Sequence, residues 1–179
     1  MKSLSEIDTV SKRASRASGF EWGVAEEVGK NIRMLEMLGI PGIKNLNHYY
    51  KVRSVKKFEK ITLIKQKNNK TQLEYCPITA GVNFLDQVKS LESLNEVRFQ
   101  NVAFPLLFLP FVSRASEVIG KKILLKMDNR KFILNYNHSI YSNSINDGII
   151  TIGNNIFITF LTNSDSFDEK EWKELYKLS

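Results

Sequence analysis

Apolar residues recur every three to four positions near the start of the chain, the pattern of amphipathic helices. A first helix is predicted over 4–18, where Ser3 and Glu6 fit a capping box and Gly19 fits a C-terminal stop. One face of this helix collects the apolar residues Leu4, Ile7, Val10, Ala14 and Ala17.

A second helix is predicted over 21–38, ending before Gly39. Glycine inside a helix costs about 1 kcal/mol against alanine, so it usually has a packing reason. Ala25 and Gly29 lie four positions apart and would form a small groove. We expect Ala14 and Ala17 of the first helix to pack into it, which makes an antiparallel helical hairpin.

Beyond residue 49 the pattern changes to short apolar runs separated by turn residues, which favours β-hairpins. A single short strand is also predicted over 95–102. The three predicted hairpins cover residues 60–76, 121–137 and 149–161, with turns at 67–70, 128–130 and 153–155.

Helices are predicted between these strands, near 77–91 and over 105–119, where Pro110 should kink the chain. Residues around His48 look like a connecting loop, and 138–148 is the longest irregular stretch of the later half. The last helix should start at Phe167, capped by Ser166 and Glu169. It is expected to dock on the body through Trp172, Leu175 and Tyr176.

The elements together predict an α+β fold: an N-terminal antiparallel helical hairpin, then a mostly antiparallel sheet of hairpins with interleaved helices. The 179 residues suit a single domain over 1–179, with the hairpin in 1–42 and a sheet-and-helix body in 43–179. The last helix stops without a C-cap, so the chain either ends naturally at Ser179 or lacks a downstream segment.

Charge is unevenly distributed along the chain, whose formal net charge is +7. Residues 1–58 carry 11 basic and 6 acidic groups, while 138–179 carry 3 and 6. The densest basic stretch consists of Lys51, Arg53, Lys56, Lys57 and Lys60. Such a stretch attracts nucleic acid or anionic substrates, although a solvated lysine-rich face is the commoner explanation.

A single cysteine, Cys76, excludes an intrachain disulfide and favours a reducing, cytoplasmic location. The polar N-terminus has no hydrophobic signal region, and the longest apolar run, 103–112, is too short to span a membrane. Because His48 and His138 have no neighbours at ligand spacing, no metal site is expected.

The strongest small motif is the stretch from Cys76 to Gly81, in which Pro77 sets the first helical turn. Free backbone N–H groups at Thr79, Ala80 and Gly81 could bind an anion, and Cys76 there is a candidate nucleophile. The alternative is a buried cysteine that closes a junction between sheet and helix.

Glu27 is the second catalytic candidate, because a carboxylate near Trp22 could act as an acid with a raised pKa. Trp22 itself is a candidate for ligand binding. In the alternative, these carboxylates are structural, with Glu26 paired to Lys30. We expect Trp22, Glu27 and the Cys76–Gly81 turn to share one wall of the main cavity.

A very apolar segment, 104–111, is interpreted as the central core helix, with a partner surface or an acyl-binding wall as the alternative. The polar residues that follow it form a shoulder where a ligand could sit, and Arg114 is the ligand-binding candidate there.

Three segments together resemble an uncharacterised bacterial family, a domain of unknown function. The first segment is 14–42, with Trp22-Gly23 followed by Ala25-Glu26-Glu27; the second is 73–88, with Cys76-Pro77 and Ala80-Gly81; the third is 102–116, with Pro105, Pro110 and Phe111. The resemblance implies relatedness but no activity. It also implies a tail beyond the last helix, which this chain does not contain.

Three function classes stay open, and no cofactor is indicated. We expect most a protein that binds a small anionic metabolite, as an enzyme or an enzyme subunit. The alternative is a non-catalytic accessory or interaction module, which would act with a protein partner or as a homo-oligomer. Nucleic-acid binding rests on basic charge alone and is the least expected, and no membrane association is expected.

Overall fold

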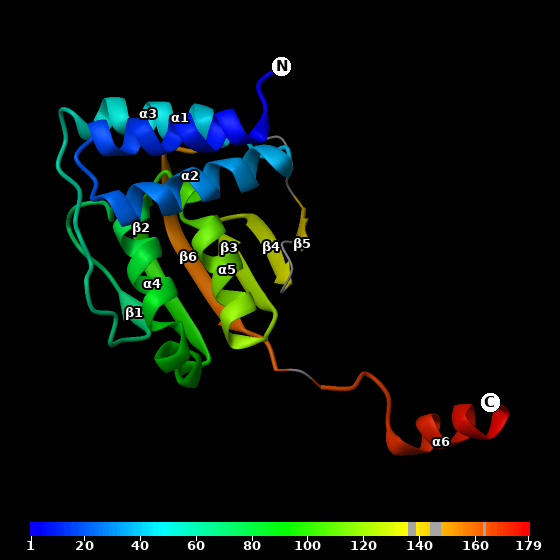
Figure 1. Cartoon of the computed structure of the whole chain (residues 1–179). Coiled ribbons are helices and arrows are strands. Elements are labelled where there is room, and N and C mark those ends of the chain that lie inside the picture. The colour runs from blue at the N-terminus through cyan, green and yellow to red at the C-terminus, as the bar shows by residue number, and fades with distance from the viewer. Residues whose placement is uncertain (136–138, 144–147, 163) are drawn as a thin grey trace.

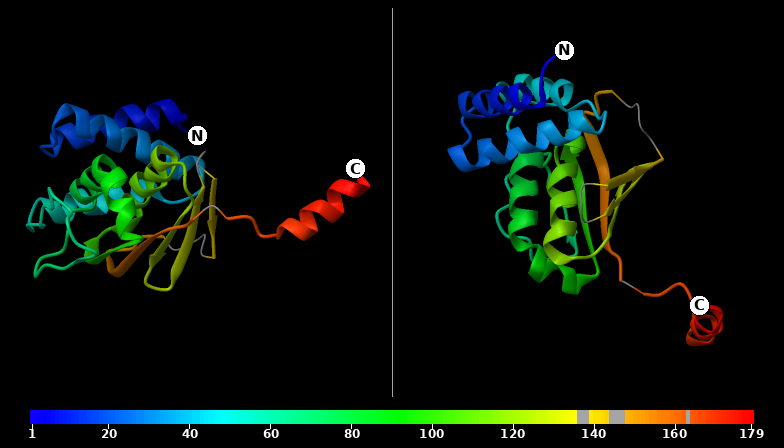
Figure 2. Two further views of the ribbon diagram at one scale, coloured as in Figure 1. Left: turned by 90° about the horizontal axis from the view of Figure 1, so that it is seen from below. Right: turned by 45° about the vertical axis from the view of Figure 1, so that its right-hand side comes forward.

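A computed structural model describes residues 1–135, 139–143, 148–162 and 164–179. Within these residues the fold is α+β, as predicted, with a six-stranded sheet in the order β1-β2-β6-β3-β4-β5. The pairing of β1 with β2 is parallel and the other pairings are antiparallel. Helices cover one face of the sheet, and three further helices form a layer across its end (Figures 1 and 2).

The helical layer begins with α1 (Leu4–Ala17) and α2 (Trp22–Met37), and the predicted hairpin is confirmed. Ser3 and Glu6 form the predicted capping box. The close contact lies at Gly29, where an added Cβ would stand 2.6 Å from Asp8 Oδ1 and 3.3 Å from Lys12 Cβ. Asp8 and Lys12, in earlier turns of α1, therefore meet Gly29 in place of the predicted Ala14 and Ala17.

The third helix of the layer, α3 (Gly42–Arg53), falls where the sequence predicted a loop around His48. Pro41 stands at its N-cap and Gly42 packs against Leu35, with a built Cβ only 3.0 Å from Leu35 Cβ. The proline–glycine pair therefore starts a helix here, after Leu38 and Gly39, with its φ of 76°, have ended the previous one. Tyr50 Oη donates to Ser15 Oγ at 2.6 Å and ties α3 to α1.

Residues 54–76 are mostly irregular, and the hairpin predicted over 60–76 is wrong. The predicted turn contains the only strand of this segment, β1 (Asn68–Asn69), which runs parallel to β2 (Glu96–Ala103). Asn69 is 9% exposed, and its Nδ2 donates to Gln66 O and Arg98 O. Polar side chains that pair with backbone thus replace the apolar alternation of a hairpin.

Two helices lie on the covered face of the sheet, α4 (Pro77–Leu91), followed by the short η1 (Glu92–Leu94), and α5 (Leu109–Ile119). The predicted helix over 105–119 is divided into η2 (Pro105–Leu107) and α5. Pro110 therefore stands in the first turn of α5 and does not kink a longer helix. Between the helices and the sheet lies the core, which includes Phe84, Phe99, Phe108, Phe111 and Phe132.

The second predicted hairpin is present as β3 (Ile123–Met127) and β4 (Arg130–Asn135), and β5 (Ser139–Ser142) pairs with β4. The third is wrong, because 153–155 lies inside one continuous strand, β6 (Ile152–Phe160). Asn155 Oδ1 accepts from Arg98 Nη2 at 2.6 Å, which fixes it as a strand residue. Much of the irregular stretch predicted over 138–148 lies outside the described residues.

The chain ends in α6 (Glu169–Leu178), which projects away from the body (Figures 1 and 2). Asp168 and Glu171 form its capping box, in place of the predicted Ser166 and Glu169. The helix has no buried residue, so the prediction that it docks on the body is wrong. Trp172, for example, is 49% exposed.

Candidate functional site

A cavity of about 410 Å³ opens between the end of α3, the segment that follows it and the start of α4. We call it the basic cavity, since four of its lining residues are cationic. Its lining consists of Tyr49, Arg53, Lys56, Lys57, Phe58, Lys60, Cys76 and Thr79. Most of the basic stretch singled out in the sequence therefore gathers around one cavity.

Backbone hydrogen bonds between distant residues build this arrangement. Glu59 N donates to Glu74 O at 2.8 Å, and Cys76 N donates to Glu59 O at 2.9 Å. These bonds hold the lysine-bearing segment alongside the residues that lead into α4. Tyr49 and Arg53 lie four residues apart on α3 and so share one helix face. The cavity thus depends on tertiary contacts and not on one local motif.

Cys76 is the N-cap of α4 and is 3% exposed. Its Sγ accepts hydrogen bonds from Tyr49 Oη at 2.8 Å, Thr79 Oγ1 at 3.3 Å and Thr79 N at 3.4 Å. Burial, with the neighbouring sulfur as a further cause, raises the pKa of Tyr49, so its hydroxyl stays a donor at neutral pH. Cys76 therefore closes the junction into α4 while forming part of the cavity wall.

The four cationic side chains are held to different degrees. Arg53 Nη1 donates to Ser18 O, and the guanidinium lies 4.3 Å from the Phe20 ring centroid. Lys56 Nζ forms an ion pair with Glu74 Oε1 at 2.9 Å. Across the described ranges, neither Lys57 nor Lys60 forms an ion pair. The cavity thus combines one fixed guanidinium with two exposed ammonium groups that are free to meet an anion.

The other residues of the Cys76–Gly81 motif face the core. Ala80 is fully buried, and its N–H donates to Cys76 O at 3.0 Å. A Cβ added at Gly81 would stand 2.1 Å from Phe111 Cδ2, so this glycine lets α4 approach α5 closely. Of the predicted motif only Cys76 and Thr79 line the cavity. The N–H groups of Thr79 and Ala80 are already bonded, which differs from the free helix start expected.

Glu27 and Arg114 form a separate pair between α2 and α5. Lys30 Nζ lies 3.1 Å from Glu27 Oε1, so Glu27 takes the lysine that the sequence assigned to Glu26. Burial works to raise the pKa of Glu27, but hydrogen bonds from Arg114 and Lys30 outweigh it and leave the pKa below its usual value. The predicted acid with a raised pKa is therefore wrong.

Trp22 does not lie with the other candidates. It is 57% exposed, and Lys12 and Arg16 of α1 lie over its ring at 5.6 and 5.5 Å from the centroid. Neither Trp22 nor Glu27 is among the residues that line the basic cavity. The structure thus brings Glu27 to Arg114 and Cys76 to Thr79, but these two groups do not form one wall with Trp22.

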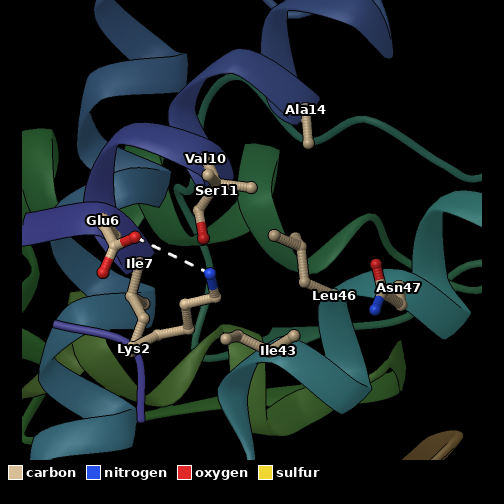
Figure 3. A pocket seen from close by; sticks show the side chains of 9 residues that line it. All are labelled: Lys2, Glu6, Ile7, Val10, Ser11, Ala14, Ile43, Leu46 and Asn47. Atoms are coloured by element: carbon tan, nitrogen blue, oxygen red, sulfur yellow. Dashed lines mark ion pairs between the residues drawn. The ribbon is translucent and has the colours of Figure 1, made fainter. Parts of the chain in front are cut away.

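A second, apolar hollow of about 190 Å³ lies between α1 and α3 (Figure 3). Its rim carries an ion pair between Lys2 and Glu6 at 3.7 Å, and we call it the α1–α3 groove. Its residues are Lys2, Glu6, Ile7, Val10, Ser11, Ala14, Ile43, Leu46 and Asn47. This groove was not expected from the sequence, because α3 was not predicted.

Tyr49 and Phe58 are site residues that sequence reasoning missed. Their ring centroids lie 5.3 Å apart, and together they supply the aromatic part of the cavity wall. The available signal was the spacing of Tyr49 and Arg53 together with the nearby lysines, but only once 42–53 is recognised as a helix. Because the residues around His48 were predicted to form a loop, Tyr49 and Arg53 were not expected to share one helix face.

Within the described part of the chain, no group of three or more His, Cys, Asp or Glu residues could hold a metal ion. In the same residues, no helix combines the length and apolar character needed to cross a membrane.

Comparison with known proteins gives one match. Neither the curated proteins nor the solved structures contain a match to this chain. The Cys76–Gly81 and Pro105–Phe111 segments lie outside the region that does match. Residues 2–75 match a family described as "Protein of unknown function (DUF3726)", so the predicted resemblance to a domain of unknown function is confirmed over that region.

Proposed function

We propose that the protein binds a small anionic metabolite in the basic cavity. The observation that carries this proposal is the convergence of Arg53, Lys56, Lys57 and Lys60 on one hollow of about 410 Å³. That volume falls in the range of small-molecule sites, roughly 300–1,000 Å³. A carboxylate or a phosphate group would relieve the repulsion between these cations and gain charge-assisted hydrogen bonds.

Each part of the wall has a role in this proposal. Lys57 and Lys60 neutralise the ligand's charge, whereas Arg53, fixed by its bond to Ser18 O, orients it. The Thr79 hydroxyl offers a further polar contact, and the Tyr49 and Phe58 rings cover the apolar part of the ligand. A site of this kind recognises a compound with an anionic group next to a flat or apolar portion.

A catalytic form of the proposal rests on Cys76, because it lines the cavity and Glu27 does not. The Sγ atom would have to exchange its present donors, Tyr49 Oη and the two Thr79 groups, for the substrate. Binding without chemistry requires no such change, and it is the form we favour. A single, buried and free cysteine is also in keeping with the bacterial cytoplasm as the place of action.

A second candidate function is that of an accessory or interaction module, favoured by the fully exposed α6. It is compatible with ligand binding, because α6 contributes no residue to the basic cavity. Nucleic-acid binding would draw on the same lysines as the metabolite proposal, and the experiment below distinguishes the two.

The test is a thermal-shift and calorimetric titration with inorganic phosphate, pyrophosphate, citrate and adenosine monophosphate. Saturable binding of at least one probe should raise the melting temperature, since ligands that bind only the native state stabilise it. Lys57→Gln with Lys60→Gln should weaken that binding by about tenfold or more, as expected for lost bonds to charged groups. Lys67→Gln, an exposed lysine of the same irregular segment, is the matched control.

Equal weakening in the Lys67 control would show a non-specific charge effect and contradict the proposal. So would the absence of any saturable binding. Tight binding of single-stranded oligonucleotides that weakens steeply with salt, together with no binding of the small probes, would favour nucleic acid instead.

A further inference from the structure

Helix α6 carries an apolar face that is exposed among the residues that the structure describes. Leu175 is 63% exposed and Tyr176 is 71% exposed, and with Trp172 they form one side of the helix. The Phe167 ring stacks on Trp172 at 5.7 Å between centroids and lengthens the face. A capped amphipathic helix with such a face in water is typical of an interaction surface.

The α1–α3 groove is an apolar hollow lined by side chains of α1 and α3, together with that of Lys2 (Figure 3). Val10 on its α1 side is 63% exposed, and Ile43 on its α3 side is 37% exposed. Its volume, about 190 Å³, is on the scale of a single large aromatic side chain. The molecule therefore presents a projecting helix with an exposed apolar face and, at the other end of the sheet, an exposed apolar groove.

The α1–α3 groove and α6 lie at opposite ends of the sheet (Figure 1). Asn45 Nδ2 donates to Gly148 O, which places α3 beside the residues that precede β6. The chain leaves the sheet at the opposite end of β6, where Leu161 N donates to Lys122 O. β6 has 9 residues, about 30 Å. Residues 162–168 span at most roughly 25 Å when fully extended. Because α6 adds only about 1.5 Å per residue, its apolar face would reach the groove of the same copy only with this segment almost fully stretched.

Charge also favours α6 as the occupant. Residues 164–179 carry five acidic and three basic side chains, with the acidic ones concentrated in and before the first turn of α6. Residues 2–17 carry four basic and two acidic side chains, and 42–53 carry three basic and no acidic ones. The segment that projects is thus acidic, and the two helices that form the groove are basic, so association is electrostatically favourable.

We propose that α6 of one copy docks its apolar face into the α1–α3 groove of a second copy, and the reverse. Such an exchange is self-complementary and closes on a two-fold axis, so it gives a dimer and not a filament. Trp172 or Leu175 enters the groove between Val10 and Ile43, and the acidic start of α6 meets the basic helices around it. The interaction leaves the basic cavity open, because the two sites share no lining residue.

Site-directed cross-linking tests this arrangement. Val10→Cys and Leu175→Cys are made in separate chains, one of which carries a size tag, and the two are mixed and oxidised mildly. Both positions are exposed, and the native Cys76 is buried and does not compete. The expected product is a disulfide-linked heterodimer of the tagged and untagged chains. Val118→Cys, an exposed apolar residue of α5, replaces Val10→Cys in the control mixture.

Three results would overturn the proposal. The first is a yield no greater than that of the Val118 control. The second is efficient linking of Leu175→Cys chains to each other in preference to Val10→Cys chains, which would show contact between two α6 helices. The third is an internal disulfide in a chain carrying both substitutions, which would show docking within one copy.

Discussion

Helices α1 and α6 have similar sequence patterns, but α1 is packed against the rest of the fold and α6 is exposed. Both are amphipathic and both have a complete capping box, Ser3 with Glu6 in α1 and Asp168 with Glu171 in α6. Yet α1 packs along α2, with Ser15 fully buried, whereas α6 buries no residue. The periodic pattern shows that a helix forms and has a face to cover. It does not show which surface covers that face.

The close approach of α1 to Gly29 of α2 is the contact that distinguishes α1 from α6. Small residues allow helices to come near each other, and Gly29 meets the backbone oxygen of Asp8, 2.8 Å from a built Cβ. Helix α6 has no corresponding contact with the part of the chain that the structure describes. We therefore compare a substitution at Gly29 with a substitution in α6, and measure the free energy of unfolding of both variants.

The largest expected effect is that of Gly29→Leu. The added side chain has no room beside Asp8, so α1 must move away from α2, and overpacking of this kind costs about 1–3 kcal/mol. The free energy of unfolding is measured by chemical denaturation. Leu175→Ala in α6, studied in dilute protein, should change it by less than about 0.5 kcal/mol. An unchanged denaturation midpoint for Gly29→Leu would show that the close contact is absent.

The two capping boxes give the next effect in size. Ser3→Ala should cost about 1 kcal/mol of global stability, because α1 unfolds together with the body. Asp168→Ala removes an equivalent cap, but it should only lower the helix content of α6, which circular dichroism detects. Equal losses of global stability from both substitutions would mean that α6 is part of the cooperative unit after all.

Low pH should destabilise the contact between α2 and α5 through protonation of Glu27. Because its pKa in the folded state lies below the usual value of 4.5, its contribution is fully present above that pH and is lost as the pH falls through the folded pKa. Glu27→Gln should therefore destabilise the protein at pH 7, by about 1 kcal/mol or less, and the difference from the native chain should shrink toward pH 3. A difference that stays constant over this range would exclude the Arg114 pair as its cause.

The smallest effect expected is a gain of stability. Gly23 has nothing within 4 Å of a built Cβ, although it lies in the same helix as Gly29. Gly23→Ala should stabilise the protein by about 0.5–1 kcal/mol, through helix propensity and a less flexible unfolded chain. Denaturation of Gly23→Ala beside Gly29→Ala checks this, since the two identical substitutions should change stability in opposite directions.

Local signals in the sequence predicted much of the fold. The caps of α1, the proline start of α4 and the turn between β3 and β4 act within a few residues of themselves, so they could be recognised without tertiary information. The errors arise where a residue has a distant partner. Gly153 looks like a turn residue, but in β6 it gives room to Pro105, whose Cβ would lie 3.2 Å from an added Cβ.

The candidate site also combines features that are local in the sequence with contacts between distant residues. The run of lysines after α3 is evident in the sequence, and so is the Cys76 motif. Their meeting depends on backbone bonds from Glu59 to Glu74 and from Cys76 to Glu59, which join segments that no periodicity connects. The pairing of Glu27 with Arg114, 87 residues apart, is equally non-local. Sequence reasoning could therefore name several of the right residues but could not group them.

The two tryptophans allow a direct measurement of the central claim, that the face of α6 is covered by a second copy. Trp22→Phe leaves Trp172 as the only indole reporter, since the chain has 2 tryptophans. We expect the fluorescence of Trp172 to shift to shorter wavelength as the protein concentration rises. Val10→Glu, which places a charge in the α1–α3 groove, should abolish the shift. Emission that stays typical of water at every concentration, or a shift that survives Val10→Glu, would contradict this claim.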